Sequence, residues 1–243
     1  MWWTLSGHRV TVHKMEQLNC RIIAHIHNPY TAKFGIPRQS GIVEEVESTI
    51  VFTPEYRNVD ALRGIEGYSH LWLVWVFSEA IRDSWSPTVL PPRLGGKTRM
   101  GVFATRSPFR PNPIGLSSVK LLGLDPHTKD GPILRVAGAD LMDGTPLLDI
   151  KPYLPFTDSH PDAIGGFSDP VRDYKLKVVF PEQWLAMVPE HLRKPAFGLL
   201  AQDPRPSYQN DPERVYGVAF GGYDFRFRVC DGVLTVCEIE KLI

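Results

Sequence analysis

The chain has 243 residues, and its 27 Lys and Arg side chains balance its 27 Asp and Glu side chains, so no overall field attracts it to nucleic acid or to a membrane. Its 22 prolines argue against a helical bundle, because proline breaks the interior of a helix. Cys20, Cys230 and Cys237 have no CxxC spacing, which argues against a disulfide framework and a zinc site. No apolar run approaches the ~20 residues that span a bilayer, and the first residues do not read as a signal peptide. We therefore expect a cytoplasmic protein with no metal site and no membrane segment.

Short apolar stretches, separated by proline and glycine turns, dominate the chain up to about residue 155. Residues 1–16 show no regular period and are interpreted as an extension. Leu71 to Phe77 is apolar throughout, which is typical of a central strand buried on both faces. Several short strands with no helix between them predict a barrel or a sandwich. The expected strands lie at residues 20–27, 71–77, 100–105, 115–124 and 133–139, with a pair of strands at 41–52 and a short helical turn at 58–63 capped by Asn58.

The pattern changes in the last third of the chain. Residues 156–172 mix Pro, Gly, Ser and Asp and are predicted to form a linker. Residues 173–243 are predicted to form a small α+β domain, whose one long helical segment, 181–200, is expected to be split by Pro189 and Pro195. Its expected strands are 215–220, 224–229 and 233–239, the first two joined by a hairpin at Gly221-Gly222.

Two familiar nucleotide-binding patterns are absent. Gly95-Gly96-Lys97-Thr98 resembles a phosphate-binding loop, but that loop needs a glycine five places before the Gly-Lys pair, and the position holds Pro91. No Gly-x-Gly-x-x-Gly occurs either. A nucleoside triphosphatase and a Rossmann-type dehydrogenase or methyltransferase are therefore not expected.

Charge is segregated along the chain although it sums to zero. Residues 91–120 carry six basic side chains and no carboxylate, whereas residues 121–170 carry eight Asp against three basic residues. Mutual pairing or solvation of the two stretches is one interpretation. In the other, three prolines fix the loop that presents Arg106, Arg110 and Asn112, so that little entropy is lost on binding. Guanidinium groups held in this way suit a phosphate or a carboxylate.

The segment Asp143-Gly144-Thr145-Pro146 is a second candidate for chemistry. Asp-Gly is ordinary turn chemistry, so a simple turn is one interpretation. In the other, free backbone groups and the carboxylate of Asp143 hold a ligand, for instance a cationic one. His70 lies beside the expected central strand and is interpreted as a core histidine whose ring nitrogens have hydrogen-bond partners.

Five segments of the chain form a recognisable set: Pro37-Arg38-Gln39, Gly67–Trp72, Pro91–Gly96, Gly101–Leu116 and Asp143–Tyr153. Together, and in this order, they resemble the TrmO/TsaA family. Members of that family are tRNA methyltransferases that use S-adenosylmethionine to methylate N6 of threonylcarbamoyladenosine at position 37, beside the anticodon. The resemblance covers residues 18–155, and the later stretch Leu200–Tyr208 resembles the C-terminal domain of bacterial members.

This resemblance implies a mainly β fold. A small N-terminal β-barrel over residues 17–155 would bind S-adenosylmethionine without a Rossmann motif, and a smaller C-terminal α+β domain would follow. The resemblance also implies a homodimer and no metal. The family has His where this chain has Ser78, so contacts at that pair are expected from the backbone. The implied cofactor-binding residues are Pro37, Arg38, Gln39, Ser78, Glu79, Arg106, Leu116, Asp143, Gly144, Thr145 and Pro146.

The implied substrate is anionic, because the tRNA backbone and the threonyl carboxylate both carry negative charge. Arg38 or Arg106 could hold the carboxylate of the cofactor, and a splayed anticodon-loop base would be recognised by stacking and edge contacts. Asp149 and Tyr153 are weak candidates for a general base, and loss of the proton to water is an equal alternative. The residues expected to face tRNA are Arg93, Lys97, Arg99, Arg110, Asn112 and Lys151.

Two alternatives come from other classes of protein. One is a non-catalytic RNA-binding barrel that uses the same basic loop. The other is a sensor that binds S-adenosylmethionine without transferring its methyl group. Methyl transfer to tRNA would separate the enzyme from both.

Overall fold

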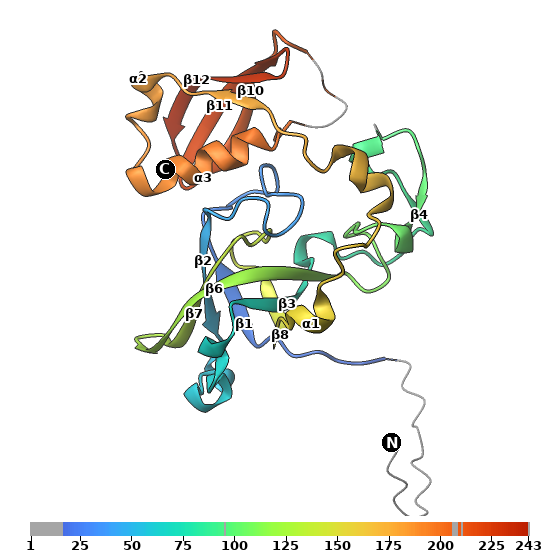
Figure 1. Ribbon diagram of the computed structural model, residues 1–243, viewed down its shortest axis with the longest axis vertical. Helices are drawn as coiled ribbons and strands as arrows, with labels where there is room; N and C mark the ends of the chain where they lie inside the picture. The colour runs from blue at the N-terminus through green and yellow to red at the C-terminus, as the bar shows by residue number, and fades with distance from the viewer. Residues whose placement is uncertain (1–16, 95, 206–208, 210, 243) are drawn as a thin grey trace, which may run out of the picture.

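The computed structural model describes residues 17–94, 96–205, 209 and 211–242, so the expected extension at residues 1–16 lies outside them. Six antiparallel strands form a closed barrel in the order β1-β2-β7-β6-β3-β8 (Figure 1). This confirms the mainly β fold with an N-terminal barrel. The barrel strands are β1 (Ala24–His27), β2 (Glu47–Phe52), β3 (His70–Val76), β6 (Ile114–Thr128), β7 (Gly131–Ala137) and β8 (Pro146–Pro152).

The expectation that the central strand is buried on both faces is wrong. Along β3 the side chains alternate between fully buried and half-buried. Leu71, Leu73 and Trp75 point into the barrel and are at most 6% exposed. Trp72 and Val76 lie on the outer face, where they line a groove. The apolar residues on the inner face of this strand therefore pack in the barrel core, and those on the outer face form part of the surface of the groove.

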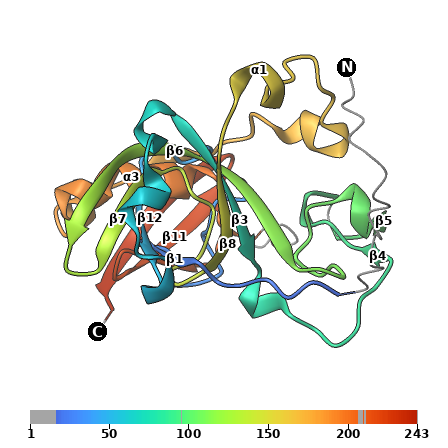
Figure 2. The same cartoon turned by 90° about the horizontal axis from the view of Figure 1, so that it is seen from below.

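Residues 77–113, between β3 and β6, leave the barrel and form a lobe with little regular structure, which Figure 2 shows to one side of the barrel. The predicted strand at 100–105 is shorter than expected, because residues 102–104 turn into a 3-10 helix. The lobe contains η4 (Ser78–Ala80), β4 (Thr88–Val89), η5 (Pro92–Leu94), β5 (Met100–Gly101) and η6 (Val102–Ala104).

The connection between β2 and β3 consists of three short 3-10 helices. The predicted cap at Asn58 is confirmed, since its side-chain oxygen accepts a hydrogen bond from the Asp60 N–H at 3.0 Å. The turn ends before Gly64, which has a φ of 87°. The three helices are η1 (Pro54–Tyr56), η2 (Val59–Leu62) and η3 (Ile65–Gly67).

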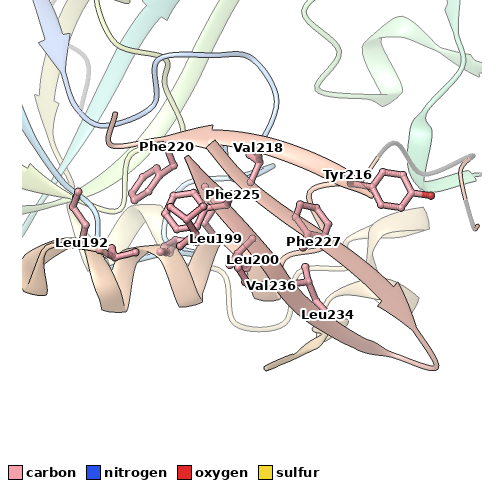
Figure 3. Close-up of a cluster of buried hydrophobic side chains, with 14 of the residues drawn as sticks. Leu192, Leu199, Leu200, Tyr216, Val218, Phe220, Phe225, Phe227, Leu234 and Val236 are labelled. Carbon is pink, nitrogen blue, oxygen red and sulfur yellow. The ribbon is translucent and has the colours of Figure 1, made fainter. Parts of the chain in front are cut away.

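The C-terminal part is a four-stranded sheet in the order β10-β11-β12-β9, packed against α3 (Figure 3). Pro189 immediately precedes α3, as expected of a helix boundary, but Pro195 lies inside the helix and does not split it. Packing of Leu192, Leu199 and Leu200 against the sheet compensates for the hydrogen bond that Pro195 cannot donate. The elements are β9 (Lys177–Val179), α2 (Glu182–Leu185), α3 (Glu190–Ala201), β10 (Tyr216–Phe220), β11 (Tyr223–Cys230) and β12 (Val233–Lys241).

The two parts of the chain share packing. Tyr30, Val43 and Val46 lie in the segment between β1 and β2, yet they are buried in the C-terminal cluster of apolar side chains. Of the pair of strands predicted at 41–52, only β2 from Glu47 is present, because residues 41–46 turn toward that second core. The segment predicted as a linker contains the end of α1 (Pro155–Asp158) and the 3-10 helix η7 (Gly166–Val171).

Candidate functional site

An open groove with a volume of about 1430 Å³ lies along the barrel. Outer-face residues of β3 and β6 form its floor, among them Val76, Ile114 and Leu116. Residues 37–40 and the lobe that follows β3 complete its lining. Leu116 is 57% exposed, so the floor presents apolar surface to whatever fills the groove.

Segments far apart in the sequence meet at this groove. The Arg106 guanidinium donates a hydrogen bond to the side-chain oxygen of Gln39. The segment that carries Gln39 is fixed to the barrel, because the Ser118 N–H donates to the Ser40 Oγ at 3.2 Å. The structure thus brings together two of the residues predicted to bind the cofactor.

The proline-rich loop is held by side chains as well as by its prolines. The Thr105 Oγ1 accepts a hydrogen bond from the Ser107 N–H at 3.3 Å, and the Arg110 Nη1 donates to the Thr105 carbonyl at 3.1 Å. The Arg82 guanidinium lies 3.7 Å from the centre of the Phe109 ring. Arg110 therefore contributes to the shape of the loop, which sequence reasoning assigned to proline alone.

Ser78 and Glu79 begin η4, one residue after the end of β3, and both line the groove. The Lys33 Nζ donates to the backbone carbonyl of Glu79 at 3.2 Å and lies 3.6 Å from its carboxylate. The pair predicted from its place after the central strand therefore lines the same groove as residues 37–40, and Lys33 is a basic neighbour that the sequence did not reveal.

In the turn at residues 143–146, three backbone N–H groups and the Asp143 carboxylate already have partners within the protein, which the ligand interpretation did not expect. The N–H groups of Asp143, Gly144 and Thr145 all donate to backbone carbonyls, at 2.8, 2.8 and 3.1 Å. The Asp143 carboxylate accepts from the Asn28 N–H and contacts the His27 ring, both at 3.1 Å. Gly144 supplies the positive φ that the turn requires, 76°. Within this segment, Thr145 lines the groove.

Three of the six residues predicted to face tRNA lie in the groove, two lie elsewhere, and one has a side chain that is not described. Arg99, Arg110 and Asn112 line the groove. Lys97 is exposed between β4 and β5 and does not line it, and Lys151 pairs with Asp149 on β8 at 2.7 Å. Arg93 lies in η5, and its side chain is outside the described part of the structure.

The two weak candidates for a base lie outside the groove lining. Asp149 pairs with Lys151 and accepts from the Ile150 N–H at 2.9 Å. The Tyr153 ring packs 5.5 Å from the Trp72 ring, centre to centre.

Sequence reasoning missed Asp140, which lines the groove. The Ser117 hydroxyl donates to the Asp140 Oδ1 at 2.5 Å, and the Trp75 indole N–H donates to the Ser117 Oγ at 2.9 Å. Burial raises the pKa of the Asp140 carboxyl, while the Ser117 hydrogen bond and the charge of Arg106 oppose the rise. The one signal in the sequence was a single acid within the small and apolar run Ala137–Leu141.

The charges that line the groove are mostly positive. The described lining residues include six basic side chains and two carboxylates. A surface of this kind attracts an anionic ligand, and closely spaced anions most of all. The basic residues are Lys33, Arg38, Arg82, Arg99, Arg106 and Arg110, and the acids are Glu79 and Asp140.

Comparison with known proteins identifies the family. The family model of the tRNA-methyltransferase O N-terminal domain matches residues 25–159, and that of the TrmO C-terminal domain matches residues 173–242. The chain belongs to the TrmO family. The first match covers the barrel with its groove, and the second covers the C-terminal sheet and helices.

Curated relatives and solved structures agree with this TrmO membership. The chain is 43% identical, over 90% of its length and 96% of the relative, to the tRNA (adenine(37)-N6)-methyltransferase of Escherichia coli. It is 42% identical, over 83% of its length and 88% of the relative, to a putative S-adenosylmethionine-dependent methyltransferase of Pseudomonas aeruginosa. A crystal structure of TrmO from that genus and species superposes with a TM-score of 0.76 at 33% identity, covering 94% of this chain and 99% of the other.

The stretch that resembles the C-terminal domain of bacterial TrmO proteins contains an ordered ion pair. The Arg205 Nε lies 2.7 Å from the Asp203 Oδ1, and both side chains are almost fully buried. The Tyr174 hydroxyl donates to the other oxygen of Asp203 at 3.0 Å. This cluster joins the start of the C-terminal part to the segment that follows α3.

The described residues contain neither a metal-binding cluster nor a membrane-spanning helix. Among the described residues, no group of three or more His, Cys, Asp and Glu side chains is placed to hold a metal ion. Within the same residues, no helix is both long and apolar enough to cross a membrane.

Proposed function

We propose that this protein transfers a methyl group from S-adenosylmethionine to N6 of the adenine at position 37 of tRNA, when that base carries the threonylcarbamoyl group. The observation that carries the proposal is the groove of a TrmO chain. Gln39, Arg106 and Leu116 all line this groove, and most of the charged side chains around them are basic. The 43% identity to a tRNA (adenine(37)-N6)-methyltransferase over nearly the whole chain supports the same reaction.

The residues of the groove fit S-adenosylmethionine. Arg106 and Gln39 offer side-chain donors at one place, which suits the carboxylate of its amino-acid end. The exposed Leu116 and the half-buried Phe77 offer the apolar surface that a sulfonium and an adenine ring require. The cofactor, when bound, supplies an electrophilic methyl group. The proposed cofactor-binding residues remain Pro37, Arg38, Gln39, Ser78, Glu79, Arg106, Leu116, Asp143, Gly144, Thr145 and Pro146.

The basic side chains of the lobe are proposed to hold the anticodon loop. Arg99 and Arg110 line the groove, and Lys97 lies on the exposed surface beside it. Phosphate contacts orient the loop, and an unstacked base can then enter the groove and be read by stacking and hydrogen bonds. The proposed tRNA-binding residues are Arg93, Lys97, Arg99, Arg110, Asn112 and Lys151.

Positioning is proposed to supply most of the acceleration. The reaction is an in-line displacement between two bound reactants, and correct alignment of such reactants removes much of the entropic barrier. The acceptor nitrogen carries a carbamoyl group and is a poor nucleophile while it keeps its proton. The proton must therefore leave during the reaction, either to a side chain of the site or to water.

Incubation of the protein with radiolabelled S-adenosylmethionine and tRNA tests the function. We expect label in tRNA that carries threonylcarbamoyladenosine and none in the same tRNA without it. Binding of RNA or of S-adenosylmethionine without label in either tRNA would instead support an RNA-binding barrel or a sensor.

The proposal assigns the exposed surface of the lobe to tRNA binding and the groove to cofactor binding. Replacement of Lys97 by alanine is expected to weaken tRNA binding about two- to tenfold and to lower the slope of log affinity against log salt by roughly 0.7–0.9, since each phosphate contact contributes that much. The dissociation constant of S-adenosylmethionine should not change. Filter binding at several salt concentrations measures the first effect and calorimetry the second. Equal losses for both ligands would show that Lys97 supports the groove itself.

The remaining expectations on organisation are part of the same proposal. We propose a barrel domain at residues 17–155, a linker at 156–172, a C-terminal domain at 173–243 and a location in the cytoplasm. We also propose a homodimer, as the resemblance to the TrmO/TsaA family implies.

A further inference from the structure

Few side chains in the groove can accept a proton. The described residues that line it include no His, Tyr or Cys. Its carboxylates are Glu79 and Asp140. Glu79 is 60% exposed and its carboxylate lies 3.6 Å from the Lys33 ammonium, so it is already engaged in an ion pair at the surface. Asp140 is the carboxylate of the groove that is held in place by the barrel.

The position of Asp140 is set by a chain of hydrogen bonds. Trp75 on β3 donates to the Ser117 hydroxyl, and Ser117 on β6 donates to the Asp140 Oδ1. Ser117 is 1% exposed and Trp75 is 6% exposed. One carboxylate oxygen is therefore fixed by groups that cannot move without disturbing the barrel, as a catalytic group requires.

The surroundings of Asp140 favour a base stronger than an ordinary aspartate. Burial raises its pKa, while the hydrogen bonds from Ser117 and the Ser40 backbone and the charge of Arg106 lower it. Tyr30 is a titratable neighbour that is buried, and its own pKa is raised, mainly by burial and partly by the charges of Asp140 and Glu45. Tyr30 therefore stays protonated, and Asp140 is the group that titrates.

We propose that Asp140 accepts the proton of the acceptor N6 during methyl transfer. The N6–H bond breaks and its proton goes to the Asp140 carboxylate, while the electron pair left on nitrogen forms the new N–C bond. The pair of the broken C–S bond stays on sulfur, so that a neutral thioether leaves. This inference rests on the proposed function and adds the identity of the base.

The decisive variant is Asp140→Asn, which keeps the shape of the side chain and removes its basicity. We expect kcat on modified tRNA to fall at least 100-fold, in line with the usual contribution of general base catalysis. The dissociation constants of S-adenosylmethionine and of tRNA, measured by calorimetry and filter binding, should stay within about threefold of wild type. Asp125→Asn, near the far end of β6, is the matched control and should keep kcat within about twofold.

The pH dependence of kcat gives a readout that a structural role would not change. A base acts in its ionised form, so the wild-type rate should fall as the pH drops through the raised pKa of Asp140. Ser117→Ala removes a hydrogen bond that lowers this pKa, so the acid limb of its profile should move to higher pH. This second variant decides the question if Asp140→Asn does not fold.

Three results would overturn the inference. One is a kcat of Asp140→Asn within about tenfold of wild type. Another is a large loss of S-adenosylmethionine binding with kcat at saturation unchanged, which would make Asp140 a cofactor ligand. The third is an acid limb that stays in place in Ser117→Ala. Each assumes an active wild type, whereas a wild type that labels no tRNA would contradict the proposed function itself.

Discussion

Replacement of Arg106 by alanine is expected to raise the dissociation constant of S-adenosylmethionine about 10- to 100-fold. The Arg106 side chain is exposed, lines the groove and donates to Gln39, so its remaining N–H groups are available to a ligand carboxylate. A charge-assisted hydrogen bond contributes about 1.5–3 kcal/mol, and each tenfold change in affinity corresponds to ~1.4 kcal/mol. The melting temperature without ligand should change little, because an exposed loop arginine contributes mainly to binding.

Titration calorimetry and melting curves on the same samples measure both effects. Arg106→Lys keeps the charge but loses the planar fork of donors, so we expect an intermediate loss. Arg63→Ala is the control, since Arg63 is an exposed arginine that pairs with Asp60 outside the groove. A large fall in melting temperature with Arg106→Ala, or unchanged affinity, would contradict the assignment of Arg106 to the cofactor site.

The strands of the barrel could be predicted because their signals are local. Short apolar stretches bounded by Pro and Gly identify β3, β6 and β7 without knowledge of their partners. The closed order of the barrel brings together strands far apart in the sequence, as in the pairing of β1 with β8, and no local pattern specifies it. The same reason explains why Val43 and Val46 were assigned to a barrel strand, although they pack in the C-terminal core.

Site residues that belong to a sequence motif could be predicted. Those whose properties depend on tertiary packing could not. Gln39 and Arg106 belong to segments that resemble a known family, and they meet in the structure. Asp140 was counted only as one acid of an acidic stretch. Its properties come from Ser117 and from burial, which exist only after β6 and the segment after β7 have come together. Pro195 is a similar case, since its tolerance within α3 depends on the sheet beneath the helix.

Replacement of Gly115 by alanine is expected to destabilise the barrel by about 1–3 kcal/mol, the usual cost of overpacking a core. Gly115 pairs with Trp75 across β6 and β3, and a Cβ at this position would lie 2.2 Å from the Trp75 ring. The ring cannot easily retreat, because it packs 4.2 Å from the Phe77 ring and donates to Ser117. In a chain of this size, each kcal/mol of lost stability lowers the melting temperature by roughly 2–4 °C, so we expect a fall of about 2–12 °C.

Gly101→Ala is the matched control, since Gly101 has a φ of −57° and no atom within 4 Å of an added Cβ. Its melting temperature should stay close to that of wild type. The double variant Trp75→Phe with Gly115→Ala tests the cause, because a smaller ring leaves room for the new methyl group. If the contact with Trp75 is responsible, the two substitutions together should cost less free energy of unfolding than the sum of their separate costs. Strictly additive costs would mean that Gly115 is required for a reason other than its contact with Trp75.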